Sequence, residues 1–311
     1  MNSPILIMAP IYGPTLKELE ATWPHRRLWE APDKAALMRE IAPDCKVVAT
    51  NGGRGITAAE IDALPQLELI ACFGVGVDAI DVAHAKGKGI AVTNTPDVLT
   101  EDVADLALSL LLATVRRIAF GDRFVRAGRW LREAAPLTMS LQQRNVGIVG
   151  LGRIGQAIAT RCAAFNTHIG YHGPRRKADS AYRYFADVVA LAEWADVLIA
   201  ACPGGAATRG IVSREALTAL GPEGVFVNIA RGSVVDQPAM VELLVSGRLG
   251  GAGLDVFADE PKVPEELFAL DSVVLQPHQG SATSTTRTAM GNLTLDNIRA
   301  WEAGKPLVTP V

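Results

Sequence analysis

The sequence predicts an α/β fold made of two doubly wound parallel sheets. Short apolar, β-rich runs recur along the 311 residues, and helix-like segments of mixed polarity separate most of them. Strands that are apolar throughout are typical of parallel sheets, because helices cover both faces of such sheets. A chain of this length also suggests two domains of ordinary size. The expected strands are Ile5–Ala9, Val47–Thr50, Leu69–Cys72, Ala91–Asn94, Val146–Val149, His168–Tyr171, Val197–Ala200, Val225–Ile229, Gly251–Leu254 and Val273–Leu275.

Two long helices are expected to join these units. Thr100 is a suitable N-cap for a helical segment that runs through residue 120 and has an acidic first turn. A second helix is expected over Thr283–Glu302, because helix-breaking residues follow it. If that helix returns the chain to the first unit, the first domain is discontinuous. We therefore expect one domain over residues 1–97 and 285–311, with a second domain over residues 98–284 inserted into it.

Composition excludes several classes of function. The chain has 30 basic and 33 acidic side chains, whereas a general nucleic-acid-binding protein needs a basic face. The four cysteines are widely spaced, so neither a metal site nor a disulfide framework is expected. No apolar run is long enough to span a bilayer, and the N-terminus lacks the features of a signal peptide. We expect a soluble, cytoplasmic protein with no nucleic-acid or membrane partner.

A glycine-rich turn occupies residues 145–155, which read NVGIVGLGRIG. Gly150 permits a tight turn after the strand, Gly152 lets a pyrophosphate approach the backbone, and Gly155 allows close helix–strand packing. The phosphates would meet the free N–H groups at the positive end of the following helix. A turn that serves packing alone is the alternative. The strand before the turn and the helix after it favour dinucleotide binding.

The next expected strand ends in a basic stretch, GYHGPRRK at residues 170–177. An NAD site should carry a carboxylate there to bind the ribose hydroxyls. Instead, His172 takes that place and is followed by Arg175, Arg176 and Lys177, with no acid before Asp179. Guanidinium groups pair well with a 2′-phosphate, so the pattern favours NADP(H) and leaves NAD(H) open. The alternative is a solvated loop that is basic by coincidence.

Further polar side chains follow the carboxyl ends of expected strands, where ligands bind in open α/β sheets. Arg231 follows GVFVNIA, Glu260 lies in GLDVFADEP, and His278 follows VVLQP. Taken singly, each is more simply explained as a surface or structural residue. Together, downstream of a dinucleotide fingerprint, they supply the anion anchor, the orienting carboxylate and the acid that carbonyl reduction requires.

Collinear motifs cover nearly the whole chain: CFGVGVDAID at 72–81, TNTPDVLTEDVAD at 93–105, VGLGRIG at 149–155, NIARGSVVD at 228–236, GGAGLDVFADEP at 250–261 and PHQGSAT at 277–283. They resemble the NAD(P)-dependent D-isomer-specific 2-hydroxyacid dehydrogenases, most closely their glyoxylate/hydroxypyruvate reductase and hydroxyphenylpyruvate reductase branch. The resemblance implies a Rossmann nucleotide-binding domain inserted in a flavodoxin-like substrate domain.

The resemblance also implies roles for individual residues. Arg231 would grip the substrate carboxylate and contact the keto oxygen, and His278 would give its proton to that oxygen. Glu260 would hydrogen-bond the histidine, and a neighbouring carboxylate favours the charged form of an imidazole. The GVGVD loop would offer backbone N–H groups at Val75 and Gly76 to the substrate carboxylate.

The resemblance further implies a set of cofactor contacts, with two departures from the family pattern. NADP-using relatives usually carry a small polar residue followed directly by Arg, where this chain has Gly173 and Pro174. Gln279 stands beside the expected acid at a position that is often apolar, where it would alter substrate preference or simply pack. The implied contacts are Thr100, Gly150, Leu151, Gly152, Arg153, Ile154, Gly155, His172, Gly173, Arg175, Arg176, Cys202, Pro203, Thr208, Ile229, Ala230, Arg231, Asp255, His278 and Gly280.

We expect an NADPH-preferring reductase of small 2-oxo acids such as glyoxylate and hydroxypyruvate, which acts by hydride transfer. A reductase of bulkier aryl 2-oxo acids is the nearest alternative, and a non-catalytic NADP(H)-sensing regulatory protein is a more distant one. The family pairs through its nucleotide domains, so we expect a homodimer in which Trp130 faces the partner subunit. Arg54, in NGGRG, is a further candidate for substrate contact, although a surface loop arginine is the simpler interpretation.

Overall fold

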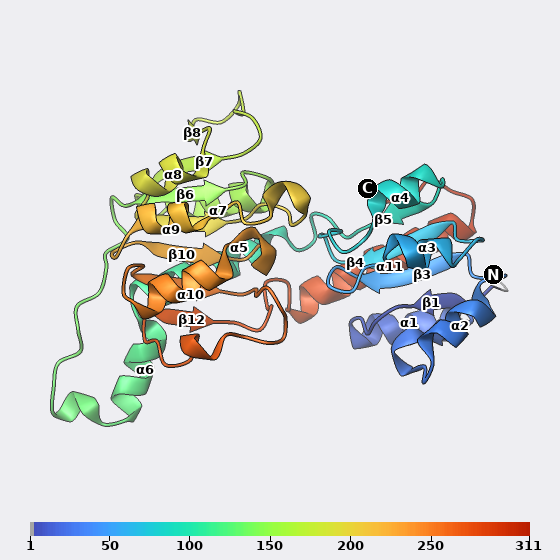
Figure 1. Cartoon of the computed structure of the whole chain (residues 1–311), viewed down its shortest axis with the longest axis horizontal. Coiled ribbons are helices and arrows are strands. Elements are labelled where there is room, and N and C mark those ends of the chain that lie inside the picture. Colours follow the sequence, from blue (N-terminus) through green and yellow to red (C-terminus); the bar gives the residue numbers. More distant parts are fainter. Residues whose placement is uncertain (1–2) are drawn as a thin grey trace. The chain divides into compact units, whose positions relative to one another are not determined.

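The computed structural model describes residues 3–311, which form two compact units (Figure 1). Unit 1 comprises the chain up to Leu99 together with Ala282–Val311, and unit 2 comprises Thr100–Ser281. Each unit contains one parallel sheet, so the predicted α/β class with two parallel sheets is confirmed. The expected domain boundaries, 97/98 and 284/285, lie within a few residues of this division.

The sheet of unit 1 has five strands in the order β2-β1-β3-β4-β5, and all of them run parallel. Apolar side chains are buried on both of its faces, as a sheet covered by helices requires. The strands are β1 (Ile5–Ile7), β2 (His25–Arg27), β3 (Val47–Asn51), β4 (Leu69–Phe73) and β5 (Ala91–Thr93). The connecting helices are α1 (Gly13–Thr22), the 3-10 turn η1 (Leu28–Glu30), α2 (Lys34–Ile41), α3 (Ala58–Asp62) and α4 (Val82–Gly87).

The C-terminal helix α11 (Ser284–Glu302) completes unit 1. Thr283 caps it by accepting a hydrogen bond from the Thr286 amide. Gly291 lets Thr15 of α1 approach so closely that a Cβ at this position would lie 1.8 Å from the Thr15 hydroxyl oxygen. The chain therefore returns to its first sheet, which makes unit 1 discontinuous.

The sheet of unit 2 has seven parallel strands in the order β12-β11-β10-β9-β6-β7-β8. The chain adds β7 and β8 on one side of β6 and then crosses back to add β9 to β12 on the other side. The strand order therefore reverses between the neighbouring strands β6 and β9. Open α/β sheets bind ligands at such a point, beyond the carboxyl ends of the strands. The strands are β6 (Asn145–Val149), β7 (His168–His172), β8 (Arg183–Phe185), β9 (Val197–Ala200), β10 (Val225–Asn228), β11 (Gly251–Leu254) and β12 (Val273–Leu275).

Helices cover both faces of this sheet (Figure 1). The paired helices α5 (Thr100–Val115) and α7 (Arg153–Ala163) lie on one face. The other layer contains α8 (Val188–Trp194), α9 (Arg214–Leu220) and α10 (Gln237–Val245), whose apolar side chains share a core with Phe226 of β10. Short 3-10 turns complete the connections: η3 (Ala206–Thr208), η4 (Gly232–Val234) and η5 (Glu265–Leu267).

The single helix expected from Thr100 to residue 120 is wrong in two respects. Thr100 is the first helical residue instead of the N-cap, and α5 ends at Val115. Arg117 adopts a left-handed conformation (φ 48°), after which a separate helix, α6 (Ile118–Arg126), begins. Aromatic residues of α6 pack against Arg129 in the 3-10 turn η2 (Arg129–Leu131). In Figure 1, α6 lies away from the sheet. The apolar pattern of the sequence continues from α5 into α6, but the helix itself is interrupted at Arg117.

Two edge strands were not predicted from the sequence. β2 (His25–Arg27) and β8 (Arg183–Phe185) each begin or end with charged residues and span three positions. Short, charged edge strands hinder pairing with other chains, so their composition differs from that of central strands. The apolar-run criterion therefore detects the central strands and overlooks these two.

The described residues 3–311 contain no helix that is both long and apolar enough to cross a membrane. Within the same range, no group of His, Cys, Asp and Glu side chains is arranged to hold a metal ion. Cys45, Cys72, Cys162 and Cys202 are all buried thiols that form no disulfide within the described residues. Burial raises the pKa of Cys45 and Cys202 to about 11 and that of Cys162 to about 12, which keeps these thiols protonated and unreactive near neutral pH.

Candidate functional site

The turn between β6 and α7 has the backbone that a dinucleotide fingerprint requires. Gly150 has φ +100°, and a Cβ there would lie 2.6 Å from the Cα of Cys202. A Cβ at Gly155 would lie 2.0 Å from the Gly150 carbonyl oxygen, so both positions exclude larger residues. At Gly152, by contrast, a Cβ would meet none of residues 3–311 within 4 Å, and no side chain of that range caps the N-terminus of α7. The open space and uncapped amides fit a pyrophosphate group.

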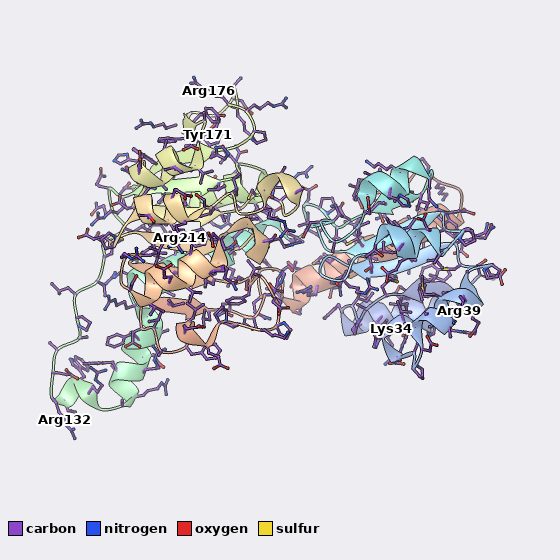
Figure 2. All side chains as sticks on the ribbon, viewed as in Figure 1. Lys34, Arg39, Arg132, Tyr171, Arg176 and Arg214 are labelled. Carbon is purple, nitrogen blue, oxygen red and sulfur yellow. The ribbon has the colours of Figure 1, made fainter. Side chains whose placement is uncertain are left out.

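The loop after β7 presents the predicted basic cluster. His172 ends the strand and lies 3.1 Å, through Nδ1, from the Phe185 carbonyl oxygen. Arg175 and Arg176 are exposed, and Lys177 is half-buried. In Figure 2 the loop that carries Arg176 lies above Tyr171 of β7. The strand end therefore offers cations where an NAD site would offer a carboxylate.

The segment after β9 forms a compact turn. The Thr208 hydroxyl donates a hydrogen bond of 2.6 Å to the Pro203 carbonyl oxygen, which closes the turn over η3. Cys202 lies directly against Gly150, because a Cβ added at Gly150 would lie 2.6 Å from the Cα of Cys202. The turn after β9 and the glycine turn after β6 are therefore neighbours at one edge of the sheet.

Arg231 follows β10 in a loop that a buried asparagine holds in place. Asn228 is completely buried, its Oδ1 accepts from the Ala230 amide at 3.0 Å, and its Nδ2 donates to the Arg231 carbonyl oxygen at 3.0 Å. The Arg231 guanidinium donates to the Ala230 carbonyl oxygen at 2.8 Å. Sequence reasoning missed Asn228, although a buried polar residue at a strand end within the NIARG motif is a usable signal.

His278 and Glu260 form the central pair of the candidate site. His278 Nδ1 lies 2.7 Å from Glu260 Oε2, while Glu260 Oε1 accepts from the Phe257 amide at 3.0 Å. Burial opposes ionisation of Glu260, but the hydrogen bonds from His278 and Phe257 outweigh it and hold the pKa of Glu260 below its ordinary value. The charge of Arg231 acts in the same direction. Arg231, Glu260 and His278 thus share one electrostatic neighbourhood.

Asp255, at the end of β11, fixes the segment that carries His278. Its carboxylate accepts from the Gln279 amide at 2.6 Å and from the Gly280 amide at 2.9 Å, and its carbonyl oxygen accepts from the His278 amide at 2.9 Å. Burial raises the pKa of Asp255 above its ordinary value, and the two amide bonds to the carboxylate oppose that rise. The Gln279 side chain is exposed and donates a hydrogen bond to the Pro277 carbonyl oxygen at 3.2 Å.

The expected substrate-contacting residues of unit 1 lie in two of its loops. Val75 and Gly76 follow β4, and the Val75 carbonyl oxygen accepts from Asn94 Nδ2 at 2.8 Å. Arg54 lies in the loop after β3 and pairs with Glu60. Burial opposes ionisation of Glu60, but the Arg54 hydrogen bond helps hold the pKa of Glu60 below its ordinary value. This ion pair gives Arg54 a structural role within its own loop.

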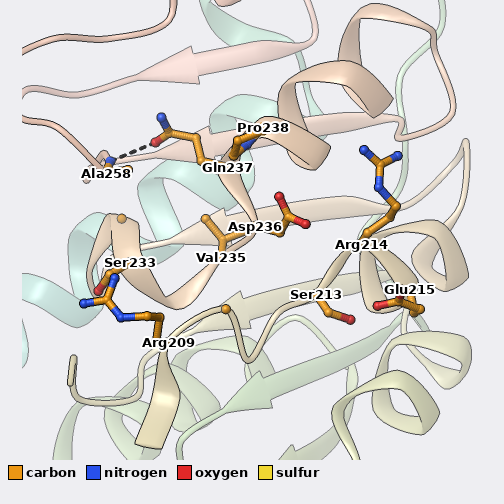
Figure 3. A pocket seen from close by; sticks show the side chains of 12 residues that line it. Arg209, Ser213, Arg214, Glu215, Ser233, Val235, Asp236, Gln237, Pro238 and Ala258 are labelled. Atoms are coloured by element: carbon orange, nitrogen blue, oxygen red, sulfur yellow. Dashed lines mark hydrogen bonds between the residues drawn. The ribbon is translucent and has the colours of Figure 1, made fainter. Parts of the chain in front are cut away.

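A cavity of about 560 Å³ lies on unit 2 between the loops that follow η3 and η4 (Figure 3). Arg231, Glu260 and His278 are not among the residues that line this cavity. Gln237, on its wall, accepts a hydrogen bond of 2.8 Å from the Ala258 amide (Figure 3). That bond ties the turn before Glu260 to α10.

The comparisons with known proteins agree with this geometry. Residues 108–280 match the family model described as "D-isomer specific 2-hydroxyacid dehydrogenase, NAD binding domain". The chain is 48% identical to a glyoxylate/hydroxypyruvate reductase A of Arabidopsis thaliana and 47% identical to a hydroxyphenylpyruvate reductase of Plectranthus scutellarioides, with 99% of this chain and 98% of each relative covered.

A solved structure shows the same architecture. It is the NADPH-dependent glyoxylate/hydroxypyruvate reductase of Sinorhizobium meliloti in complex with NADP and malonate, which is 43% identical to this chain with a TM-score of 0.91. The match covers 100% of this chain and 97% of that one. On the motifs, the two sheets and these matches, the chain belongs to the D-isomer-specific 2-hydroxyacid dehydrogenase family.

Proposed function

We propose that the protein reduces small 2-oxo acids such as glyoxylate and hydroxypyruvate to D-2-hydroxy acids, with NADPH as the preferred reductant. The observation that carries the proposal is the His278–Glu260 pair, 2.7 Å apart, at the edge of a sheet whose first turn is built for a dinucleotide. The names of relatives that match almost end to end support the substrate class.

The cofactor is assigned to the carboxyl edge of the sheet in unit 2. The backbone of residues 150–155 would hold the pyrophosphate, because Gly152 leaves open space in front of uncapped amides. Arg175 and Arg176 would bind the 2′-phosphate of NADPH. When bound, the reduced nicotinamide supplies the hydride that the reaction consumes.

The substrate is assigned to Arg231 and His278. Arg231 binds the substrate carboxylate through its guanidinium, which holds the keto oxygen in reach of the acid. His278 gives the proton at Nε2 to that oxygen as negative charge develops there, since Nδ1 is already engaged by Glu260. Glu260 is ionised, and its hydrogen bond with Nδ1 fixes the plane of the His278 ring. Backbone N–H groups at Val75 and Gly76 are assigned to the carboxylate as well.

A reductase of aryl 2-oxo acids is the second candidate. It is favoured by the 47% identity to a hydroxyphenylpyruvate reductase, which nearly equals the identity to the glyoxylate/hydroxypyruvate reductase. The same Arg231, Glu260 and His278 would serve either substrate, because only the group beyond the keto carbon differs. The choice between the two therefore lies in the residues that surround that group.

The proposal extends to the assembly and location of the protein. The arm formed by α6 and η2 bears exposed apolar side chains, among them Trp130 at 71% and Leu131 at 90% exposure. Large exposed apolar residues in one segment are typical of an interface. We assign this arm to a homodimer contact between nucleotide-binding units. The four buried cysteines, which form no disulfide within the described residues, support a cytoplasmic location.

Replacement of His278 tests the assignment of the acid. His278→Gln should lower kcat for glyoxylate or hydroxypyruvate with NADPH by about 10²–10⁴-fold, the usual contribution of a general acid. The dissociation constant of NADPH, measured by fluorescence titration, should change little. His168→Gln, which alters an exposed histidine at the start of β7, serves as the control. A near-normal kcat in His278→Gln would remove His278 from the mechanism.

Replacement of the basic pair tests the cofactor preference. Arg175→Ala/Arg176→Ala should raise KM for NADPH by about a hundredfold or more and leave KM for NADH nearly unchanged, because charge-assisted hydrogen bonds contribute about 1.5–3 kcal/mol each. Lys34→Ala/Arg39→Ala, which removes two exposed cations of unit 1, is the matched control (Figure 2). Equal changes for both cofactors would contradict the phosphate clamp.

Charged residues in the arm test the homodimer. Wild-type protein should sediment at about twice the chain mass of 32.9 kDa, and Trp130→Glu/Leu131→Glu should sediment as a monomer, because buried unpaired carboxylates destabilise an interface. Phe268→Glu, at a residue of unit 2 that is 64% exposed outside the arm, should remain dimeric. Monomeric wild-type protein would show that the assignment is wrong.

A further inference from the structure

The side chains of Arg175 and Arg176 form no hydrogen bond or ion pair within residues 3–311. Both guanidinium groups are exposed. The backbone of the loop therefore decides where the two cations lie. A mobile backbone would spread them over many positions and weaken the recognition of a single phosphate.

Two tyrosine hydroxyls fix that backbone, one at each end of the arginine pair. The Lys177 amide donates a hydrogen bond of 2.7 Å to the Tyr171 hydroxyl oxygen. The Tyr184 hydroxyl donates to the Gly173 carbonyl oxygen at 3.3 Å. Gly173 and Lys177 enclose Arg175 and Arg176 in the sequence, so the arginines lie on a short segment that is held at both sides.

The two tyrosines pack against each other. Tyr171 and Tyr184 are paired neighbours on the parallel strands β7 and β8, and their ring centroids lie 5.4 Å apart. Tyr171 is only 1% exposed, so its ring is fixed in the core while its hydroxyl reaches the loop (Figure 2). Beyond the loop, the guanidinium carbon of Arg183 lies 4.7 Å from the ring centroid of Phe185, and this contact anchors the start of β8.

We propose that Tyr171 and Tyr184 are positioning residues for cofactor selection: their hydroxyls hold residues 173–177 so that Arg175 and Arg176 meet the 2′-phosphate of NADPH. This inference rests on the proposed phosphate clamp. Neither tyrosine touches the cofactor in this proposal, because their contacts run to the loop backbone. Their effect is therefore confined to ligands that carry a 2′-phosphate.

The test removes each hydroxyl and keeps the ring. Tyr171→Phe should raise KM for NADPH about three- to tenfold, the factor that corresponds to the loss of one net hydrogen bond, while kcat and KM for NADH stay unchanged. Tyr184→Phe should have a smaller effect in the same direction, because its bond is longer. Tyr182→Phe is the matched control, since the Tyr182 hydroxyl lies in the same segment and makes no hydrogen bond with residues 3–311.

Binding and exchange measurements give readouts that do not depend on turnover. By calorimetry, Tyr171→Phe should weaken adenosine 2′,5′-bisphosphate about three- to tenfold and leave adenosine 5′-monophosphate unchanged. Amide hydrogens of residues 175–177 should exchange faster in this variant, as followed by mass spectrometry.

The outcomes separate this inference from the phosphate clamp itself. If Arg175→Ala/Arg176→Ala weakens the bisphosphate but Tyr171→Phe does not, the clamp stands and the positioning role is overturned. Equal weakening of both nucleotides by Tyr171→Phe would show a general structural role and would also overturn it. If the arginine variant leaves bisphosphate binding unchanged, the clamp fails and the inference fails with it.

Discussion

The candidate site depends on the hydrogen bonds that the buried carboxylate of Asp255 accepts. The residue is 1% exposed, and its oxygens accept the amides of Gln279 and Gly280. A buried carboxylate without such partners would be costly, so these bonds fix the chain immediately after His278. They also offset the cost of the left-handed conformation of His278 (φ 54°), which for a residue other than glycine is about 1–2 kcal/mol.

The parallel sheet explains why residues distant in sequence meet at this carboxylate. β10 and β11 are neighbours, and β11 pairs with β12, so the segments that carry Arg231, Asp255 and His278 leave the sheet at one edge. Each segment then has its own polar anchor. Asn228 holds the Arg231 loop, and Gln237 holds the turn before Glu260. The site is therefore a set of short loops, each tied to a neighbouring strand or helix by one buried or half-buried polar side chain.

Sequence reasoning recovers the residues whose type is dictated by chemistry or by a lack of space. Gly150 and Gly155 admit no Cβ, so the glycine fingerprint could be read directly, and the His278–Glu260 pair is where the motifs place it. The break at Arg117 could not be predicted, because the apolar pattern continues into α6 while the backbone turns.

The contact that anchors the loop after β7 could not be predicted from the sequence either. Tyr171 reads as an ordinary buried strand residue, and only the fold shows that its hydroxyl reaches the Lys177 amide. Asn228 differs, since a polar residue at the end of an apolar strand could have been recognised. Pairs that join residues of different elements need coordinates, whereas patterns within one element do not.

Reduction of small 2-oxo acids with NADPH can be tested by kcat/KM for glyoxylate, hydroxypyruvate, phenylpyruvate and 4-hydroxyphenylpyruvate, each measured with NADPH and with NADH. We expect the highest values for glyoxylate or hydroxypyruvate with NADPH. If the small acids were poorer than the phenylpyruvates by more than about tenfold, the proposed substrate class would be wrong.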